Sequence, residues 1–283
     1  MKTIHLAAVA LAVAIIAFSG CITKEGPKME VVDVTVSGST TVMPLAESCA
    51  EEFNRIGNAY HVLVTGGGSG VGITNIAQGR SMIGMASREV KSSERERFQN
   101  GDRKFEEHLV AFDGICIAVS QAVFDSGVTA LSKEEVKAIY NGEITNWNGL
   151  GGPDEEIYVV ARELGSGTRD TFNEMVMGDL KAETPGIQTV GASNSEIKTA
   201  VASSDHAIGY LGYNYAQSGP IRALAYDGVE PTIENIKDGS YPLTRKLYFY
   251  TFGKPSPGAQ AFIDFIGGPD GNAIAEENGY IPA

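Results

Sequence analysis

The sequence predicts an α/β protein with largely parallel sheets, because short apolar runs alternate along the chain with segments whose apolar residues recur at helical spacing. Val32, Val34 and Val36 alternate with polar residues, which is typical of a strand. The segment 46–56 follows, with Ala, Cys, Phe and Ile at helical spacing. Clusters of Gly, Ser and Thr separate several such segments, where strands end and helices begin.

The other elements follow from the same periodicities and from helix-start signals. The Ser-Lys-Glu-Glu stretch at 132–135 and the Ser-Asn-Ser-Glu stretch at 193–196 are capping boxes, each of which opens a helix. Serine and proline at 256–257 start another helix, since serine suits the cap and proline the first turn. Expected strands cover residues 32–36, 61–65, 82–86, 109–120, 157–161 and 247–252. Expected helices cover 46–56, 71–77, 91–99, 132–140, 168–177 and 193–202, and one begins at 256.

Length and composition exclude several classes of protein. The 283 residues suffice for two domains or one large one. Hydrophobic residues make up 43% and charged residues 20%, which is typical of a globular protein and not of a disordered one. The formal charge is −13 and the chain has no basic run, so we expect no nucleic-acid partner.

The N-terminal segment is expected to direct export. Residues 1–20 predict a signal peptide, with an apolar run (6–18) too short for a spanning helix, which needs about twenty residues. The Phe-Ser-Gly-Cys stretch at 18–21 resembles the lipobox of exported lipoproteins, in which cleavage precedes a lipid-bearing cysteine. We therefore expect lipidation of Cys21 and a tether over 21–30, outside the cytoplasm and at the membrane. An uncleaved anchor and a plain signal peptide are the alternatives.

The two other cysteines, Cys49 and Cys116, are not a disulfide framework. Cys49 lies on the apolar stripe of an expected helix and Cys116 inside an expected strand. We expect both to be small buried side chains.

Four strand-to-helix junctions carry the functional signal. They are Ser-Gly-Ser-Thr-Thr at 37–41, Gly-Gly-Gly-Ser-Gly at 66–70, Ala-Ser-Arg at 86–88 and Arg-Glu-Leu-Gly-Ser-Gly-Thr-Arg at 162–169. Ligands of α/β sheets bind where strand ends meet helix starts, and amides, hydroxyls and guanidinium groups there suit an oxyanion. Ordinary capping and turn chemistry explains any one junction, but explains all four together less readily.

Enzyme and metal patterns are poorly supported. The glycine-rich stretch at 66–70 lacks the lysine of a nucleotide-binding loop, and no serine has the glycine spacing of a hydrolase nucleophile. His61, His108 and His206 show no paired spacing, so we expect neither a metal site nor a catalytic triad. We expect Trp147 to be a packing anchor.

From about residue 31 onward, the chain resembles the phosphate-binding proteins of phosphate-specific ABC importers. The resemblance rests on GSTTVMPLAE at 38–47, GGGSGVGI at 66–73, IGMASREV at 83–90, FDGI at 112–115, GEITNWNGLGG at 142–152, RELGSGTRDTF at 162–172 and AIGYLGY at 207–213. It implies the two-lobed periplasmic-binding-protein-like fold of type II, with the ligand cleft between the lobes. Lobe one is then expected over 31–112 plus 222–283, and lobe two over 113–221.

Matched residue by residue, the resemblance implies a phosphate site built from the four junctions. The matching residues are Ser39, Thr40, Thr41, Ser69, Gly70, Ser87, Arg88, Arg162, Ser166, Gly167 and Thr168. Many members of the family carry an aspartate at the position of Arg88, which accepts a hydrogen bond from protonated phosphate, and an acid at the position of Leu164. Asp113 and Glu163 are the candidate replacement acceptors, and a solvent-facing strand position is an equal reading of Asp113.

The expected function is binding of inorganic phosphate and its delivery to an ABC permease. The resemblance implies a lipid-anchored monomer that needs no cofactor and catalyses no reaction. Three alternatives stay open: a binding protein for another tetrahedral oxyanion such as sulfate, a secreted hydrolase of phosphate esters, and a surface lipoprotein with an adhesive or sensing role.

Overall fold

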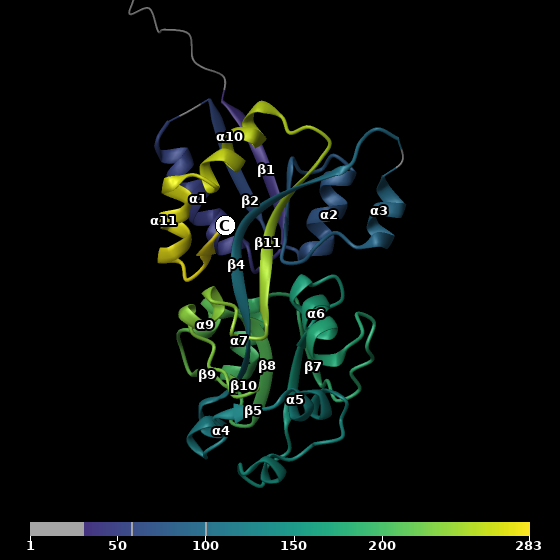
Figure 1. Ribbon diagram of the computed structural model, residues 1–283, viewed down its shortest axis with the longest axis vertical. Helices are drawn as coiled ribbons and strands as arrows, with labels where there is room; N and C mark the ends of the chain where they lie inside the picture. Colours follow the sequence, from purple (N-terminus) through teal and green to yellow (C-terminus); the bar gives the residue numbers. More distant parts are fainter. Residues whose placement is uncertain (1–30, 58, 100) are drawn as a thin grey trace, which may run out of the picture. The chain divides into compact units, whose positions relative to one another are not determined.

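Two long strands, β4 (Phe105–Ser120) and β11 (Thr244–Phe252), run antiparallel through the middle of the fold and connect its two lobes (Figure 1). The computed structural model describes residues 31–283 except residues 58 and 100. The predicted signal peptide, lipidation at Cys21 and tether therefore lie outside the described residues.

Lobe one is a sheet with helices on both sides. Its strand order is β2-β1-β3-β11-β4, in which β1 (Val32–Gly38) pairs in parallel with β2 (Tyr60–Thr65) and β3 (Ile83–Ala86). The short strand β12 (Ile281–Pro282) pairs with β4. The helices of this lobe are α1 (Met43–Arg55), α2 (Ser69–Ala77), α3 (Ser92–Phe98), α10 (Pro257–Ile266) and α11 (Pro269–Glu277). Figure 1 shows α1, α10 and α11 on one side of the sheet and α2 and α3 on the other.

Lobe two continues the same sheet through β4-β8-β6-β7. Its main strands are β6 (Tyr158–Arg162), β7 (Thr189–Gly191) and β8 (Ala207–Gly212), with the short strands β5 (Ala130–Leu131), β9 (Ile221–Ala223) and β10 (Ala225–Tyr226). Its helices are α4 (Gln121–Asp125), α5 (Lys133–Tyr140), α6 (Gly167–Phe172), α7 (Asn194–Ala202), α8 (Tyr213–Ala216) and α9 (Ile233–Lys237). A 3-10 turn covers Trp147–Leu150, and a π-helical turn, Asn173–Met177, follows α6 directly.

Each lobe has its own buried core. Phe53, Phe249 and Phe262 belong to the core of lobe one, where aromatic rings meet edge to face or tilted. In lobe two the ring of Phe172 stacks on that of Tyr210 with centroids 4.0 Å apart. Trp147 is fully buried in the same core and its indole N–H donates to the carbonyl of His206, which confirms the expected packing role.

The structure confirms the three helix starts that the capping residues predict. Ser132 accepts from the amide of Glu135 at the start of α5, and Ser193 accepts from the amide of Glu196 at the start of α7. Ser256 caps α10, with proline in the first turn. Cys49 and Cys116 are buried and free, as expected.

The expectation of largely parallel sheets was wrong at the centre of the fold. β11 runs antiparallel to β3 and to β4, and β4 runs antiparallel to β8. The reason is that β4 leaves lobe one and β11 returns to it, so the two crossing strands must run in opposite directions.

The packing of the segment before β11 bears on the lobe boundary at the return crossing, which the sequence analysis expects at residue 222. Leu224, Tyr226, Ile236 and Leu243 pack into the core of lobe two. We therefore propose that the chain re-enters lobe one along β11, at about residue 244, and not at residue 222.

Candidate functional site

The four junctions lie at strand ends that meet where the lobes face each other. On lobe one they are the residues after β1 (39–41), the start of α2 (69–70) and the residues after β3 (87–88). On lobe two they are the end of β6 and the first turn of α6 (162–168). Hydrogen bonds between the lobes join these segments. The segments are therefore close together, and their binding of an anion stays a prediction.

The centre of the cluster is a pair of threonines, one from each lobe. Thr41 Oγ1 and Thr168 Oγ1 lie 3.1 Å apart. The guanidinium of Arg245 donates to both oxygens, at 2.9 Å to Thr168 and 3.1 Å to Thr41. The side-chain amide of Asn194 donates to Thr41 Oγ1 at 3.0 Å and to Thr40 Oγ1 at 3.3 Å. All five side chains are buried, so the interactions are shielded from water.

A pair of serines packs against the first turn of α6. Ser69 Oγ and Ser87 Oγ lie 3.3 Å apart, and both residues are fully buried. A Cβ atom at Gly167 would lie 2.3 Å from Ser69 Oγ and 2.4 Å from Ser87 Oγ. The amide of Gly70 donates to the carbonyl of Gly165 across the lobes at 3.0 Å. Glycine at 167 is therefore required for this close approach.

Two of the predicted residues use their hydroxyls for the local backbone. Ser39 Oγ accepts from the amide of Thr41 at 3.2 Å. Ser166 Oγ caps α6 by accepting from the amide of Arg169 at 3.3 Å. Both serines are buried, and their hydroxyls hold the two segments in shape.

Arg162 is a buried cation at the end of β6. Its guanidinium donates to the carbonyls of Gly191 at 3.3 Å and Ala192 at 3.0 Å. The ion pairs formed among the described residues do not include Arg162. Burial lowers the pKa of Arg162 to about 10, and the charge of nearby Arg245 acts in the same direction. With a pKa of about 10 the residue is charged at neutral pH, although none of the carboxylates of the described residues forms an ion pair with it.

Asp113 is a buried ion-pair partner, not a solvent-facing residue. Its Oδ2 accepts from Arg245 Nη2 at 2.7 Å and from Arg245 Nε at 3.0 Å. Its Oδ1 accepts from the amide of Tyr213 at 3.2 Å. Burial raises the pKa of Asp113, and the guanidinium of Arg245 opposes this shift. The carboxylate is thus engaged by donors of the protein itself.

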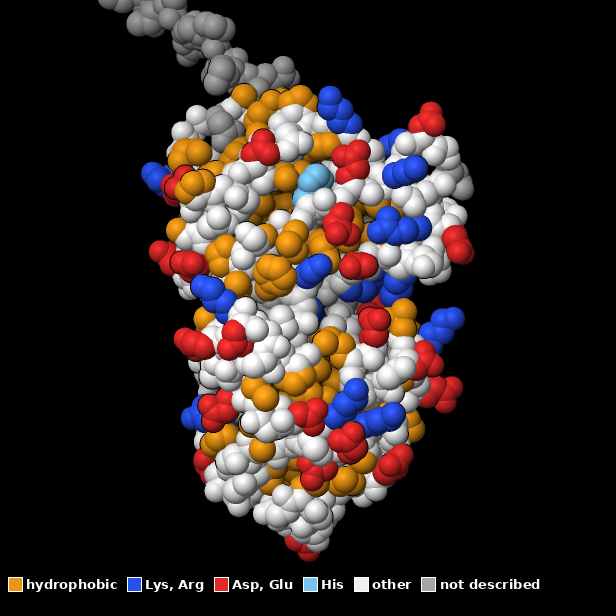
Figure 2. All heavy atoms as spheres, viewed as in Figure 1, with side chains coloured by type: hydrophobic (Ala, Val, Ile, Leu, Met, Phe, Trp, Pro, Cys, Tyr) orange, Lys and Arg blue, Asp and Glu red, His pale blue; other side chains and the backbone are white. Residues whose placement is uncertain are grey.

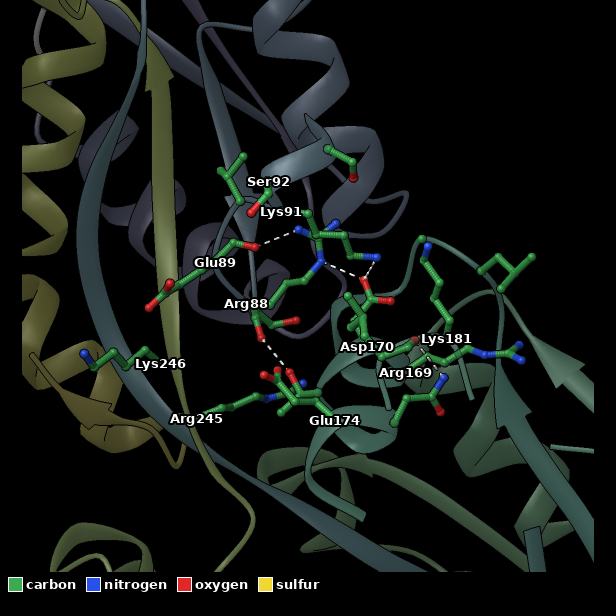
Figure 3. A pocket seen from close by; sticks show the side chains of 18 of the residues that line it. Arg88, Glu89, Lys91, Ser92, Arg169, Asp170, Glu174, Lys181, Arg245 and Lys246 are labelled. Atoms are coloured by element: carbon green, nitrogen blue, oxygen red, sulfur yellow. Dashed lines mark hydrogen bonds and ion pairs between the residues drawn. The ribbon is translucent and has the colours of Figure 1, made fainter. Parts of the chain in front are cut away.

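The guanidinium of Arg88 is engaged by two carboxylates, Asp170 and Glu94, and Figure 3 shows its contact with Asp170. Its Nε donates to Asp170 Oδ2 at 2.7 Å. Its Nη1 and Nη2 donate to the two oxygens of Glu94 at 2.9 and 2.8 Å. The side chain therefore meets acids of both lobes, and its predicted contact with an anion stays a prediction.

A cavity of about 930 Å³ lies beside the cluster and is lined by both lobes. It reaches the cluster at Ser87 and Arg245. Lys and Arg side chains gather along it, and Figure 2 shows blue side chains where the two lobes meet. The charged side chains of its lining are Arg88, Glu89, Lys91, Arg169, Asp170, Glu174, Lys181, Arg245 and Lys246. Cations outnumber acids there, which favours an anion near the cluster.

Other kinds of site find no support in the part of the chain that the structure describes. Its His, Cys, Asp and Glu side chains form no group that could hold a metal ion. Its helices include none with the length and hydrophobicity needed to cross a bilayer.

Sequence reasoning missed two members of the cluster. Asn194 was read only as part of a capping box, although its amide reaches both threonines of lobe one. Arg245 precedes the expected strand at 247–252 and carries no local motif. Only the pairing of β11 with β4, which sets Arg245 opposite Asp113, identifies it.

Comparison with known proteins identifies the family. Residues 23–269 match the family model described as the PBP superfamily domain. The phosphate-binding protein PstS of Bacillus subtilis is 34% identical over 250 residues, covering 88% of this chain and 80% of that protein. The chain belongs to the PstS family of phosphate-binding proteins.

Solved structures of the PstS family share the fold. A putative phosphate ABC transporter substrate-binding protein from Clostridium perfringens, solved with bound phosphate, has a TM-score of 0.81 and 35% identity, covering 89% of this chain and 99% of that one. An ABC-type phosphate transport receptor from Vibrio cholerae has a TM-score of 0.70 and 32% identity, covering 88% and 100%. Both support the two-lobed fold.

The buried pair of Asp113 and Arg245 leads to a first prediction. Arg245→Met should lower the free energy of unfolding by about 3–5 kcal/mol at neutral pH, because it leaves a buried carboxylate without its partner. The double variant Arg245→Met with Asp113→Leu should recover most of this loss. Urea unfolding of the two variants measures the difference, and equal stabilities would contradict the prediction.

The same variant has a definite pH dependence. Without Arg245, burial alone acts on Asp113 and its folded-state pKa rises further above the unfolded value of about 3.9. The folded state then binds more protons, so stability falls as pH rises from about 4 towards the folded pKa. The loss should be absent below both pKa values, and a loss that persists at low pH would exclude Asp113 as its cause.

Proposed function

We propose that this protein binds inorganic phosphate in the cleft between its lobes, outside the cytoplasm, and delivers it to the permease of an ABC importer. The observation that carries the proposal is the convergence of buried donors from both lobes on one place. Arg162 and Arg245 bring two positive charges and Asp113 removes one, which leaves a net positive charge in a buried, hydroxyl-rich cluster. The names of the PstS relatives and the bound phosphate of the Clostridium perfringens structure support the same ligand.

The proposed site has the chemistry of a phosphate clamp. Guanidinium groups donate charge-assisted hydrogen bonds to oxyanions. The hydroxyls of Thr41, Thr168, Ser69 and Ser87 both donate and accept, so one of them can accept the proton of a protonated phosphate oxygen. Because Thr41 belongs to lobe one and Thr168 to lobe two, an anion that binds to both hydroxyls would favour the closed lobes.

Transport, and not catalysis, is the proposed role. Neither the serines nor the threonines of the cluster have a histidine among their hydrogen-bond partners within the described residues. His61 pairs with Asp33 on the surface, and His108 contacts Thr251. A phosphate-ester hydrolase needs a metal or a nucleophile that a neighbouring base activates. Among the described residues, the hydroxyls of this cluster have no histidine beside them to act as that base. We propose that no cofactor takes part and that the protein acts as a monomer.

We propose different roles for the residues of the site. Arg162, Thr41, Thr168, Ser69, Ser87 and Gly167 are proposed to contact the anion, with Thr40 and Gly70 beside them. Ser39 and Ser166 are proposed to shape the two segments, and Asp113 to position Arg245. Arg88 is proposed to act outside the cluster.

Calorimetry of the purified protein with phosphate, sulfate and arsenate tests the assignment. We expect saturable binding of phosphate to one site and weaker binding of sulfate. Equal affinities for phosphate and sulfate would favour a general oxyanion carrier, and absence of binding to all three would favour an adhesive or sensing role. Release of phosphate from a generic ester would instead favour the hydrolase.

Arg162 provides the second prediction. Arg162→Ala should weaken phosphate binding about ten-fold or more, since hydrogen bonds to charged groups contribute about 1.5–3 kcal/mol each. Arg222→Ala is the matched control, because Arg222 is exposed on β9. The affinities are compared by calorimetry after thermal melts have shown that both variants fold. An Arg162→Ala protein that binds phosphate like the control would remove Arg162 from the site.

Gly167 provides the third prediction. Gly167→Ala should weaken phosphate binding at least ten-fold, because its Cβ would displace the hydroxyls of Ser69 and Ser87. Gly149→Ala is the control, since a Cβ there meets no atom within 4 Å. Unchanged affinity of Gly167→Ala would show that the two serines do not depend on this close approach.

The membrane anchor is the fourth prediction, and it rests on the sequence alone. We propose that Cys21 carries the lipid that holds the protein at the outer face of the cytoplasmic membrane. Cys21→Ser should leave the precursor uncleaved or release the protein from the membrane, which cell fractionation and electrophoretic mobility report. Normal processing and membrane retention of Cys21→Ser would refute the lipid anchor.

A further inference from the structure

Among the described residues, two ion pairs join the lobes, and both involve the carboxylate of Asp170. Arg88 follows β3 and Lys91 caps α3, so both belong to lobe one, whereas Asp170 lies in α6 of lobe two. Arg88 Nε and Lys91 Nζ each lie 2.7 Å from Asp170 Oδ2 (Figure 3). The side chains of Arg88 and Asp170 are only 8% and 10% exposed, so water screens this pair little.

The other ion pairs among residues 31–283, without 58 and 100, do not bridge the lobes. Arg55 pairs with Glu52 inside α1, and His61 pairs with Asp33 between β2 and β1. The pair of Arg245 and Asp113 joins the two crossing strands. Separation of the lobes would therefore break the pairs on Asp170 and leave these others intact.

Glu94 provides Arg88 with a partner whether the cleft between the lobes is closed or open. It belongs to lobe one and binds two nitrogens of Arg88 at 2.8 and 2.9 Å. When the lobes part, Arg88 keeps this partner and is not left as an uncompensated buried charge, which would be costly. Opening is thus made reversible, because only the contacts to Asp170 must form again.

The ion pairs fasten the same segments that form the cluster. Arg88 directly follows Ser87, and Asp170 lies in the same short helix as Thr168. Thr171 Oγ1 donates to the carbonyl of Ser87 at 3.5 Å beside them. We propose that Arg88, Lys91 and Asp170 form an ion-pair clasp that holds the lobes closed over the bound anion and slows its release. The clasp rests on the proposed function, and its members are positioning residues that do not touch the anion.

Stopped-flow kinetics of phosphate binding tests the clasp. Asp170→Asn should raise the dissociation rate about ten-fold and change the association rate less than two-fold, because loss of a buried charge pair acts mainly on dissociation. High salt should speed dissociation from the unmodified protein by screening the pair of Lys91, whose side chain is 26% exposed, and should have a smaller effect on Asp170→Asn. Glu174→Gln is the control: Glu174 lines the same cavity but belongs to none of the ion pairs of the described residues. Equal dissociation rates of Asp170→Asn and Glu174→Gln would overturn the clasp while leaving phosphate binding intact.

A double-mutant cycle separates the clasp from a general loss of stability. Arg88→Gln and Asp170→Asn should together raise the dissociation rate less than the product of their separate effects, since both remove one interaction. Effects that multiply would contradict a direct coupling.

A measurement without ligand keeps the clasp testable if phosphate does not bind. Small-angle X-ray scattering of the ligand-free protein should show a larger radius of gyration for Asp170→Asn than for Glu174→Gln. If the unmodified protein fails to bind phosphate, the proposed function fails, and the scattering comparison alone decides the clasp. Identical radii would then overturn it.

Discussion

The ion pair of Arg245 and Asp113 is the interaction on which the site depends. The two residues lie opposite each other on β11 and β4, the strands that pass through both lobes. Held by Asp113, the guanidinium reaches Thr41 from one lobe and Thr168 from the other. Asp113 also limits the charge of the cluster, because without it Arg245 and Arg162 would be two buried cations with no anion between them. One pair therefore fixes the geometry of the cluster and its net charge.

An acidic protein can still capture an anion because the relevant field is local. The whole chain carries a formal charge of −13, but exposed charges farther away than about 8–10 Å are largely screened at physiological salt. The proposed site contains the buried cations Arg162 and Arg245, and cations outnumber acids in the lining of the adjoining cavity. Burial strengthens their effect, since a charged group in a poorly hydrated place is screened less than one at the surface.

The sequence predicted the features that are local and missed those that are made by pairing of distant strands. Capping boxes of four residues that begin at Ser132 and Ser193 predict the helices that follow, and the glycine-rich junctions predict the ends of strands. Arg245 has no such signal, because its partner Asp113 is distant in sequence and close only through the pairing of β11 with β4. The same cause applies to the return crossing: residues 222–243 carry no local signal of their lobe, and our proposal that they belong to lobe two rests on their packing.

Arg88 bears on how the proposed site recognises a protonated oxygen. The sequence resemblance implies an aspartate that meets the ligand at this position, and this chain has a cation there. Arg88 forms ion pairs with Glu94 of lobe one and Asp170 of lobe two, so its charge is compensated and its side chain connects the lobes. A protonated phosphate oxygen must then donate its hydrogen bond to another group of the proposed site, one that can accept as well as donate. In the cluster these are the hydroxyls of Thr41, Thr168, Ser69 and Ser87, so discrimination between phosphate and sulfate would rest on the orientation of hydroxyl groups and not on a fixed carboxylate.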